Sequence, residues 1–346
     1  MSTITDVAKK ANVSISTVSR VLNNDETITV MNETRERIIQ IAEELKYSTP
    51  KKKTTKRKDT TNNYQIGVIM YGSKEDENSD PFFLAIREGV EKQCEESGIA
   101  ISELIRLRNS TPSSTLHELD GIIVIGKIDP KEIEAVYPKS NHIVYINDSP
   151  NPKYYDSIIS DLHMAASEVL HHLSSLGHEK IGFLGGYEYV QRFNNNKKKY
   201  VQETRREIYE KWMKEKKLYY PDYVFLGDWT TVSGYSQIMA AIKKGNLPTA
   251  IFAASDPMAI GALRALNECG IRVPDDMAVA SIDDIDIAGF LNPPLTTVKI
   301  YTEQMGRTAV NMLLERIHGR EVPVKIVFPT SLIIRESCGY VLEKMQ

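Results

Sequence analysis

The sequence predicts a small all-helical head followed by a larger α/β body made of two parallel-sheet subdomains. Residues 4–23 have the pattern of two short helices joined by a tight turn, and the second helix is small, polar and basic on one face. From residue 64 onward, short continuous apolar runs alternate with helical segments, which is typical of parallel sheets covered on both faces. The alternation starts again after about residue 161, and this restart predicts two similar subdomains.

Length and composition are those of an ordinary globular protein. The 346 residues suffice for about two to three domains, and 41% hydrophobic and 26% charged residues are average values. The N-terminus has no apolar signal core, and no apolar run approaches the ~18 residues of a membrane span. We therefore expect a cytoplasmic protein with no membrane partner. Cys94, Cys269 and Cys338 lie far apart without CxxC spacing, so we expect reduced, buried thiols.

Charge is distributed unevenly along the chain. Residues 1–60 contain 12 Lys/Arg and 8 Asp/Glu, a net charge of +4, although the whole chain has a net charge of −3. A basic end on an acidic body is typical of nucleic-acid binding, because neutralising phosphates needs local rather than global positive charge. A basic solubility tail would give the same pattern, and charge alone does not distinguish it from a nucleic-acid-binding head.

The head is expected to fold around one small core. Thr5 or Asp6 can cap the first helix, and Ser14 can cap the second. Asn12 falls between them, where the backbone is expected to be left-handed, a conformation that Asn tolerates well. A third helix is expected over residues 32–46. The expected core positions recur at helical spacing: Val7, Ala8, Ala11, Val18, Val21, Leu22, Ile38, Ile39, Ile41, Ala42 and Leu45. This arrangement suits placing the second helix in the DNA major groove.

Residues 48–63 form a linker between head and body. They contain no aliphatic or aromatic side chain, and they hold six basic residues and one acid. The linker can be a plain spacer or can follow DNA phosphates beside the head, and we expect both roles.

The body follows a strand–helix–strand order. Expected strands cover residues 66–70, 121–125, 142–146, 180–184, 250–254 and 278–282, and expected helices cover 82–97, 164–176, 203–217 and 257–270. In such folds a ligand binds in the crevice beyond the carboxyl ends of the strands.

Six motifs occur in the order found in one protein family. They are Thr5-Asp-Val-Ala with Val13-Ser-x-x-Thr-Val-Ser-Arg-Val-Leu-Asn23, Leu176-Gly-His-Glu-Lys-Ile-Gly-Phe-Leu-Gly-Gly186, Ala253-Ala-Ser-Asp-Pro-Met-Ala-Ile-Gly-Ala262, Ile282-Asp-Asp284, Pro294-Leu-Thr-Thr297 and Arg335-Glu-Ser337. On these motifs the chain resembles the lactose/galactose repressor (LacI/GalR) family of bacterial transcription regulators, from about Thr3 to Ser337. The stretch from Asp80 to Val90 and the lysine-rich linker are similar to the family's galactose-operon repressors of Gram-positive bacteria.

The resemblance implies the domain organisation and the partners. It implies a helix-turn-helix DNA-binding domain over residues 1–47, a basic hinge over 48–63 and a periplasmic-binding-protein-like effector and dimerisation domain over 64–346. One subdomain is expected from about 64–160 and 296–328, and the other from about 161–295 and 329–346. The family works as a homodimer on double-stranded operator DNA, and a small-molecule effector in the cleft changes the affinity for that DNA.

The resemblance also assigns roles to residues of the head. Ile15 and Ser16 match the two main base-reading positions, where Ile15 can touch a thymine methyl and Ser16 can bond several base edges. Arg20 matches the family's arginine and can pair with guanine O6 and N7; its alternative is a phosphate or intradomain contact. Phosphate contacts are expected from Thr5, Ser14, Thr17, Ser19, Asn23 and Tyr47, and from Lys51, Lys52 and Lys53. Capping is the alternative role of Thr5 and Ser14.

The linker departs from the family pattern. The family usually wedges leucines of a hinge helix into the minor groove, but Thr49-Pro-Lys-Lys-Lys53 has no large apolar residue. Inserted apolar side chains are what lever a base step apart. We therefore expect weaker kinking of the DNA, with Lys51–Lys58 adding salt-dependent affinity for the backbone.

The family fold places ten residues of this chain around the cleft: Asp80, Phe82, Phe83, Asn147, Asp148, Arg205, Tyr209, Trp229, Asp256 and Asp283. Carboxylates with one Arg and one Trp suit a neutral polyol, because acids bond paired hydroxyls and Trp covers the apolar face of a sugar ring. We therefore expect a sugar, with galactose or a galactoside as the first candidate. The alternative is a purine or a phosphorylated protein corepressor; a purine would favour stacked Phe or Tyr with fewer acids.

Structural roles compete with ligand binding at several of these positions. Phe82 and Phe83 could belong to the core, and Asp80 could simply cap its helix. Trp229 could pack between the subdomains, and Asp283 could be a turn former. Asn147 stands where the family usually has Asp, which weakens the case for that contact.

Other classes of function fit the sequence less well. An enzyme is not expected, because the chain has no HExxH, GxSxG or GxxxxGK[ST] motif and no cluster of metal-ligand residues. We expect no cofactor and no metal site. A periplasmic sugar carrier would share the body fold, but it would need a signal peptide and no DNA-reading head.

Overall fold

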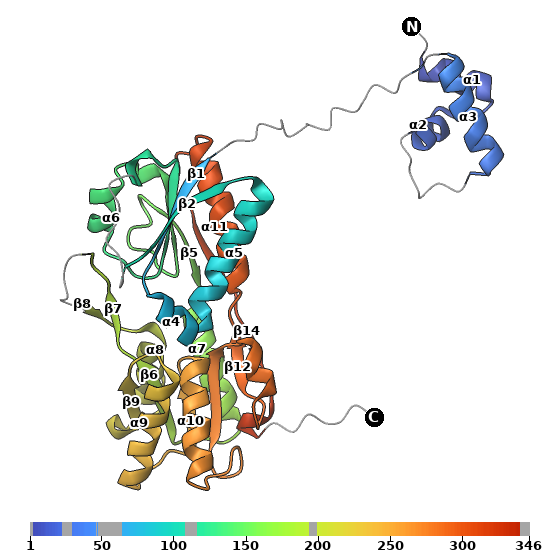
Figure 1. The fold of residues 1–346 in the computed structure, drawn as a ribbon. Coiled ribbons are helices and arrows are strands. Elements are labelled where there is room, and N and C mark those ends of the chain that lie inside the picture. The colour runs from blue at the N-terminus through green and yellow to red at the C-terminus, as the bar shows by residue number, and fades with distance from the viewer. Residues whose placement is uncertain are drawn as a thin grey trace. The chain divides into compact units, whose positions relative to one another are not determined.

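The computed structural model describes residues 3–22, 30–45, 47, 64–107, 116–193 and 199–339. The chain divides into two compact units, residues 1–62 and 63–346. The first is a small helical head and the second is an α/β body with two mostly parallel sheets, so the predicted fold class is confirmed (Figure 1). Within the described ranges, no helix is both long enough and apolar enough to cross a membrane.

Short helices build the head: α1 (Ile4–Ala11), α2 (Ile15–Leu22) and α3 (Asn32–Glu44). The helix α1 begins earlier than the expected cap. Thr3 Oγ1 accepts a hydrogen bond from Asp6 N at 3.4 Å, and the Asp6 carboxylate accepts one from Thr3 N at 2.8 Å, which together form a capping box. Asn12 ends the helix with φ 52° and ψ 47°, the left-handed conformation that its side chain type tolerates.

The core of the head lies between the helices α1, α2 and α3. Val7 and Val18 are fully buried, and Ile38 of α3 is fully buried beside them. Ile39 was expected in this core but is 42% exposed. Ile38 and Ile41 occupy the inward face of α3, and an adjacent residue turns ~100° away from that face.

The first subdomain is a parallel sheet with strands in the order β13-β5-β4-β3-β1-β2. Its strands are β1 (Gln65–Met70), β2 (Ala100–Arg106), β3 (Gly121–Ile125), β4 (Ile143–Ile146), β5 (Asp156–Ser160) and β13 (Lys325–Phe328). Its helices are α4 (Lys74–Ser79), α5 (Pro81–Ser97), α6 (Pro130–Val136) and α11 (Thr302–Ile317), with the short η1 (Leu116–Glu118) and η2 (Ser140–His142). The middle strands are almost wholly buried, which explains their continuous apolar sequences.

The second subdomain repeats this plan with strands in the order β14-β12-β11-β10-β6-β9. Its strands are β6 (Ile181–Gly186), β9 (Val224–Gly227), β10 (Ala250–Ala253), β11 (Ala278–Asp283), β12 (Thr296–Lys299) and the antiparallel β14 (Ser331–Ile333). Its helices are α7 (Leu162–Ser175), α8 (Thr204–Glu215), α9 (Thr231–Lys244) and α10 (Asp256–Glu268), with η3 (Pro221–Tyr223), η4 (Asp286–Phe290) and η5 (Glu336–Cys338). A separate hairpin joins β7 (Glu188–Val190) to β8 (Lys199–Val201).

The chain passes between the two sheets after β5, after β12 and after β13. We expected residue 296 to begin the return to the first subdomain. Instead β12 pairs with β11, with Thr296 opposite Ala280, so the second subdomain continues to Lys299. The polar sequence Thr296-Thr297 concealed this strand, although both threonines are fully buried.

The same helix-packing device appears in both subdomains. A Cβ atom on Gly89 of α5 would lie 2.2 Å from the Glu303 carbonyl of α11, and one on Gly306 would lie 2.1 Å from the Ile86 carbonyl. Gly234 of α9 and Gly261 of α10 make the equivalent close approach. The helices therefore pack backbone to backbone, which supports the expected structural repeat.

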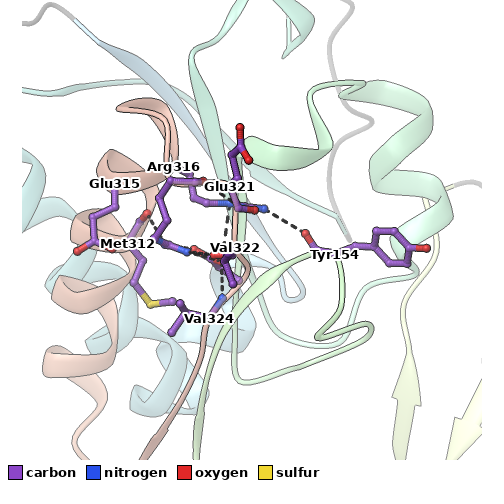
Figure 2. Close-up of polar contacts among 9 residues, drawn as sticks. Tyr154, Met312, Glu315, Arg316, Glu321, Val322 and Val324 are labelled. Atoms are coloured by element: carbon purple, nitrogen blue, oxygen red, sulfur yellow. Dashed lines mark hydrogen bonds and ion pairs between the residues drawn. The ribbon is translucent and has the colours of Figure 1, made fainter.

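A buried network of ion pairs and hydrogen bonds lies beside the start of β5 in the first sheet (Figure 2). The side chains of Asp156 and Arg316 are fully buried, and Arg316 Nε lies 3.8 Å from Asp156 Oδ1. Arg316 also donates to the carbonyls of Tyr154, at 3.2 Å, and Glu321. Arg320 Nη1 and Val324 N donate to Asp156 Oδ1 at 3.1 and 2.9 Å. The network joins α11 to β5 and β13.

The cysteines match the expected pattern only in part. All are free, and Cys94 and Cys338 are buried. Cys269 lies at the C-cap of α10 and is exposed, so the expectation of a buried thiol is wrong there.

Candidate functional site

The surface of α2 carries the residues expected to read DNA. Ile15 is 47% exposed, and Ser16 and Arg20 are exposed beside it on the same helix. Thr17 and Ser19 are half-buried, and Thr5 of α1 is exposed. A large apolar side chain left in water at the start of a helix suits contact with a partner.

Ser14 has the capping role that we gave as its alternative. Its Oγ accepts a hydrogen bond from Thr17 N at 3.1 Å and lies 2.7 Å from Ser16 Oγ. Tyr47 is half-buried against the core of the head, so its ring is held by packing. The expected contacts from Asn23, Lys51, Lys52 and Lys53, and the expected behaviour of the hinge, fall outside the described residues.

A cavity of about 1660 Å³ lies in the body, where the carboxyl ends of the strands of both sheets meet. From the first subdomain it is lined after β1, β3 and β4, and from the second after β6, β9 and β10 and at the end of β11. The expected residues that line it are Asp80, Phe82, Phe83, Asn147, Asp148, Arg205, Trp229 and Asp283. Phe82 and Phe83 also pack against the core, so the structural role that we considered for them is present, and they line the cavity as well.

Asp80 stands at the N-terminus of α5. Its Oδ1 accepts a hydrogen bond from Phe82 N at 3.0 Å, and Pro81 occupies the first helical position, which starts the helix at the cavity wall. Burial raises the pKa of Asp80 to about 6, although the Phe82 amide and the Arg205 guanidinium act against this shift. The carboxyl therefore both caps the helix and faces the cavity.

Arg205 of α8 is the fixed cation of the cavity. Its Nε lies 2.6 Å from Glu203 Oε1, its Nη1 donates to the Ala254 carbonyl at 2.6 Å, and its guanidinium lies 4.6 Å from the centre of the Trp229 ring. Burial acts to lower the pKa of Arg205, but Glu203 and Asp283 raise it above the usual value. The arginine keeps its charge in a partly dry site.

Trp229 is held in a single place by its neighbours. Its Nε1 donates to the Tyr187 carbonyl at 3.0 Å. A Cβ atom on Gly186, at the end of β6, would lie 2.4 Å from the ring, so only glycine leaves room for it. Arg205 and the backbone of Gly186 both lie against the ring, and the remaining part of Trp229 lines the cavity.

Asp283 ends β11 and is buried, with 7% of its surface exposed. Its φ of 134° is strained for a residue with a side chain, and Asn147 on the opposite subdomain has φ 61°. Burial raises the pKa of Asp283 well above its usual value, and Asp256 and Asp80 raise it further. A protonated carboxyl can donate as well as accept a hydrogen bond, but the ionised form accepts the stronger bonds from sugar hydroxyls.

The structure places two expected residues away from the cavity. Tyr209 is fully buried under β6, where its hydroxyl donates to the Ile181 carbonyl at 2.8 Å. Asp256 is fully buried, and its carboxylate accepts hydrogen bonds from Ser281 Oγ, from Thr297 Oγ1 at 2.6 Å and from Ile285 N at 2.9 Å. Both expectations are corrected: these polar groups are already engaged within the second subdomain.

Ser255 precedes Asp256 at the end of a strand, but it was not among the ten residues expected to bind the effector. Ser255 lines the cavity and is 3% exposed. Among the residues that the structure describes, nothing bonds its Oγ. A buried hydroxyl of this kind needs a partner, and a ligand hydroxyl would supply one. The signal was its position, because Ser255 follows the end of β10 by two residues and is the N-cap of α10.

Comparisons with known proteins agree with this architecture. Residues 3–50 match a family described as bacterial regulatory proteins, lacI family, and residues 170–338 match a periplasmic binding protein-like domain. The HTH-type transcriptional repressor MelR of Bacillus subtilis is 43% identical over 97% of both chains. The HTH-type transcriptional regulator GalR of Streptococcus thermophilus is 37% identical over 97% of this chain and 99% of its own. The structure of a complex of the transcriptional regulator CelR with cellobiose is 26% identical, with a TM-score of 0.63, and the match covers 97% of this chain and 100% of that one.

Proposed function

Because this chain belongs to the LacI family of bacterial regulatory proteins, we propose that it represses a carbohydrate-utilisation operon and that a sugar in the cavity alters its affinity for operator DNA. It is a DNA-binding transcriptional repressor and not an enzyme. The observation that carries the sugar proposal is the set of Asp80, Asp283, Arg205 and Trp229 around one cavity.

The chemistry of that set suits a polyol better than a purine. Acidic groups from both subdomains face the cavity beside the guanidinium of Arg205 and one indole ring. Paired hydroxyls can bond several of these groups at once, while Trp229 covers the apolar face of the ring. The sugar-bound CelR structure supports the same class of ligand. Galactose or a galactoside is our first candidate.

The mechanism we propose is a shift between two arrangements of a homodimer. Two heads bind the two half-sites of a nearly palindromic operator. The sugar contacts both subdomains, so it favours one relative arrangement of them and changes the spacing of the heads. A coupling free energy of about 1–3 kcal/mol would change operator affinity by roughly 5–150-fold.

A thermal-shift screen followed by operator binding tests the effector. We expect at least one sugar from a panel with galactose, glucose and galactosides to raise the melting temperature and to change the affinity for the operator in a fluorescence anisotropy assay. Hypoxanthine and guanine serve as purine controls. Stabilisation by a purine with no response to any sugar would overturn the proposal.

Arg20 on α2 is expected to contact bases of the operator. We expect Arg20→Ala to weaken specific operator binding by about 1–3 kcal/mol per half-site, because one bidentate contact to guanine is lost in each of the two half-sites. The residue belongs to the head and the cavity lies in the body, so sugar affinity should not change. The measurement is operator affinity against DNA with one altered base pair per half-site.

The matched control for Arg20 is Arg37→Ala, which removes an exposed arginine from α3 of the same head. That change should reduce affinity for all DNA sequences similarly, without loss of discrimination. If Arg20→Ala retains full discrimination between operator and altered DNA, its proposed role in reading bases is wrong.

A further inference from the structure

We propose that the cavity holds a second sugar ring beneath the β7–β8 hairpin, so that the effector is a disaccharide rather than a single hexose. This inference rests on the proposed sugar-binding function and specifies the class of ligand. It comes from two groups of side chains that lie in the same cavity on different elements.

The first group, which we call the inner subsite, consists of Asp80, Arg205, Trp229, Ser255 and Asp283. Its acids lie around Arg205, and the buried Ser255 Oγ indicates that the ligand carries a hydroxyl group at this place. One pyranose ring would satisfy these groups, with Trp229 against its face.

The second group, which we call the hairpin subsite, consists of Tyr71, Lys127, Asp148, Glu188 and Tyr189. It contains an ion pair of its own, in which Lys127 Nζ lies 3.1 Å from Glu188 Oε2. Asp148 accepts a hydrogen bond from Ser149 N at 2.8 Å, and burial raises its pKa to about 6 against the effect of that bond and of Lys127. The hairpin subsite therefore contains its own partners for hydroxyl groups.

Aromatic side chains form one wall of the hairpin subsite. The rings of Tyr71 and Tyr189 are 5.5 Å apart between centres, and Tyr71 stacks on Phe83 at 6.1 Å. Tyr189 is 6% exposed, so its ring is fixed by packing. A Cβ atom on Gly126 would lie 2.6 Å from Tyr71 Cβ, and this glycine lets Tyr71 lie close to the sheet. Tyr71, which is half-buried and lines the cavity, gives this wall a second aromatic contact for a sugar, separate from Trp229.

The hairpin is attached to the first subdomain as well as to the second. It follows β6 directly, yet Gln191 N donates to the Lys127 carbonyl at 2.8 Å and Asp129 N donates to the Gln191 carbonyl at 3.0 Å. Arg192 Nη2 lies 2.7 Å from Asp129 Oδ2. Figure 1 shows β7 and β8 beside the gap between the two sheets of the body. These contacts hold the hairpin subsite in place over one side of the cavity.

The size of the cavity agrees with two rings. Pockets for drug-sized ligands usually enclose ~300–1,000 Å³, and this cavity has a volume of about 1660 Å³. A hexose is smaller than a drug-sized molecule. One ring in the inner subsite would leave the hairpin subsite, with its buried acid and aromatic wall, without a ligand.

Titration calorimetry of the full-length protein tests the inference. The probes are galactose and glucose as monosaccharides, and melibiose, lactose and cellobiose as disaccharides. We expect at least one disaccharide to bind about tenfold or more tightly than either monosaccharide, since the second ring adds hydrogen bonds and an aromatic contact. If a monosaccharide binds as tightly as every disaccharide, the second ring is overturned while the proposed function stands. If no sugar of either size binds, both proposals fail.

Variants locate the second ring. Tyr189→Ala and Asp148→Asn should each weaken the disaccharide roughly tenfold more than the monosaccharide. Asp148→Asn keeps the shape of the side chain, so the test remains valid if Tyr189→Ala does not fold. Tyr200→Ala is the matched control, because Tyr200 pairs with Tyr189 across the hairpin but is 62% exposed. Equal losses for both sizes of sugar in Asp148→Asn would place the second ring elsewhere and overturn the inference.

Discussion

Arg205→Ala is expected to weaken effector binding by on the order of 100-fold and to leave a repressor that no longer responds to its sugar. Truncating one partner of a buried ion pair within a chain destabilises the fold by about 3–5 kcal/mol, because the remaining charge stays buried; here that charge is Glu203, which is 4% exposed. The loss of sugar affinity has a different source. The ligand no longer meets a charged donor, and hydrogen bonds to charged groups contribute about 1.5–3 kcal/mol, while Trp229 loses the guanidinium that lies 4.6 Å from its ring centre.

The loss of Arg205 also changes the acids around it. Arg205 acts to lower the pKa of both Asp80 and Asp283, so its removal should raise both values further. A larger share of these carboxyls would then be protonated near neutral pH, and the hydrogen bonds that they accept from sugar hydroxyls would weaken. The residual sugar affinity of the variant should therefore increase with pH between about 6 and 8.

The measurement combines calorimetry with the responding sugar and operator affinity with and without that sugar. Operator affinity without sugar should stay close to that of the unaltered protein, because the head does not contain Arg205. Arg206→Ala is the matched control: its Nε pairs with Glu210 at 2.8 Å, and its side chain is 37% exposed. A variant Arg205→Ala that still releases or tightens its operator in response to sugar would show that the cavity binds its effector differently.

Asp156→Ala is expected to destabilise the body by about 3–5 kcal/mol, the usual cost of removing one partner of a buried ion pair. The change leaves the fully buried Arg316 without its carboxylate and removes the acceptor for Val324 N. Burial already lowers the pKa of Arg316, and Asp156 acts against that effect, so the loss of this carboxylate leaves the guanidinium with backbone carbonyls as its partners.

Urea unfolding followed by tryptophan fluorescence measures this loss, because Trp212 and Trp229 both belong to the unit 63–346. Asp275→Ala is the matched control, since Asp275 pairs with Arg272 at 3.2 Å on the surface and both side chains are more than 60% exposed. An exposed pair contributes about 0–1 kcal/mol. Similar midpoints for the two variants would mean that water reaches Arg316 and that the network contributes little.

Much of the fold follows from local patterns. Continuous apolar runs predict β1, β3 and β4 because both faces of a parallel sheet are covered, and each of these strands is buried. Asn12 and Ser14 mark the turn and the second cap of the head because their side chains suit those backbone positions. Local polarity suggests a loop at Thr296 and Thr297, and only the tertiary pairing of β12 with β11 and β14 shows that they form a buried strand.

The place of a residue in the sequence predicts some of the side chains that line the cavity but not others. Arg205 and Tyr209 lie four residues apart on one face of α8, so helical spacing alone predicts the same orientation for both side chains. Arg205 is near the N-terminus of the helix and reaches the cavity, while Tyr209 lies one turn further along and is buried against β6. Ser255 and Asp256 are adjacent, and the start of α10 decides which of them faces the ligand.

The sequence by itself determined the family, the order of head and body, and the strand ends that carry polar residues, because these depend on motifs and on periodicities of a few residues. Tertiary structure alone decided which side chains meet. The contacts of Lys127 and Asp129 with Glu188, Gln191 and Arg192 join residues about 60 positions apart. No local pattern encodes that separation, because the hairpin reaches the first subdomain only once both sheets have folded and packed.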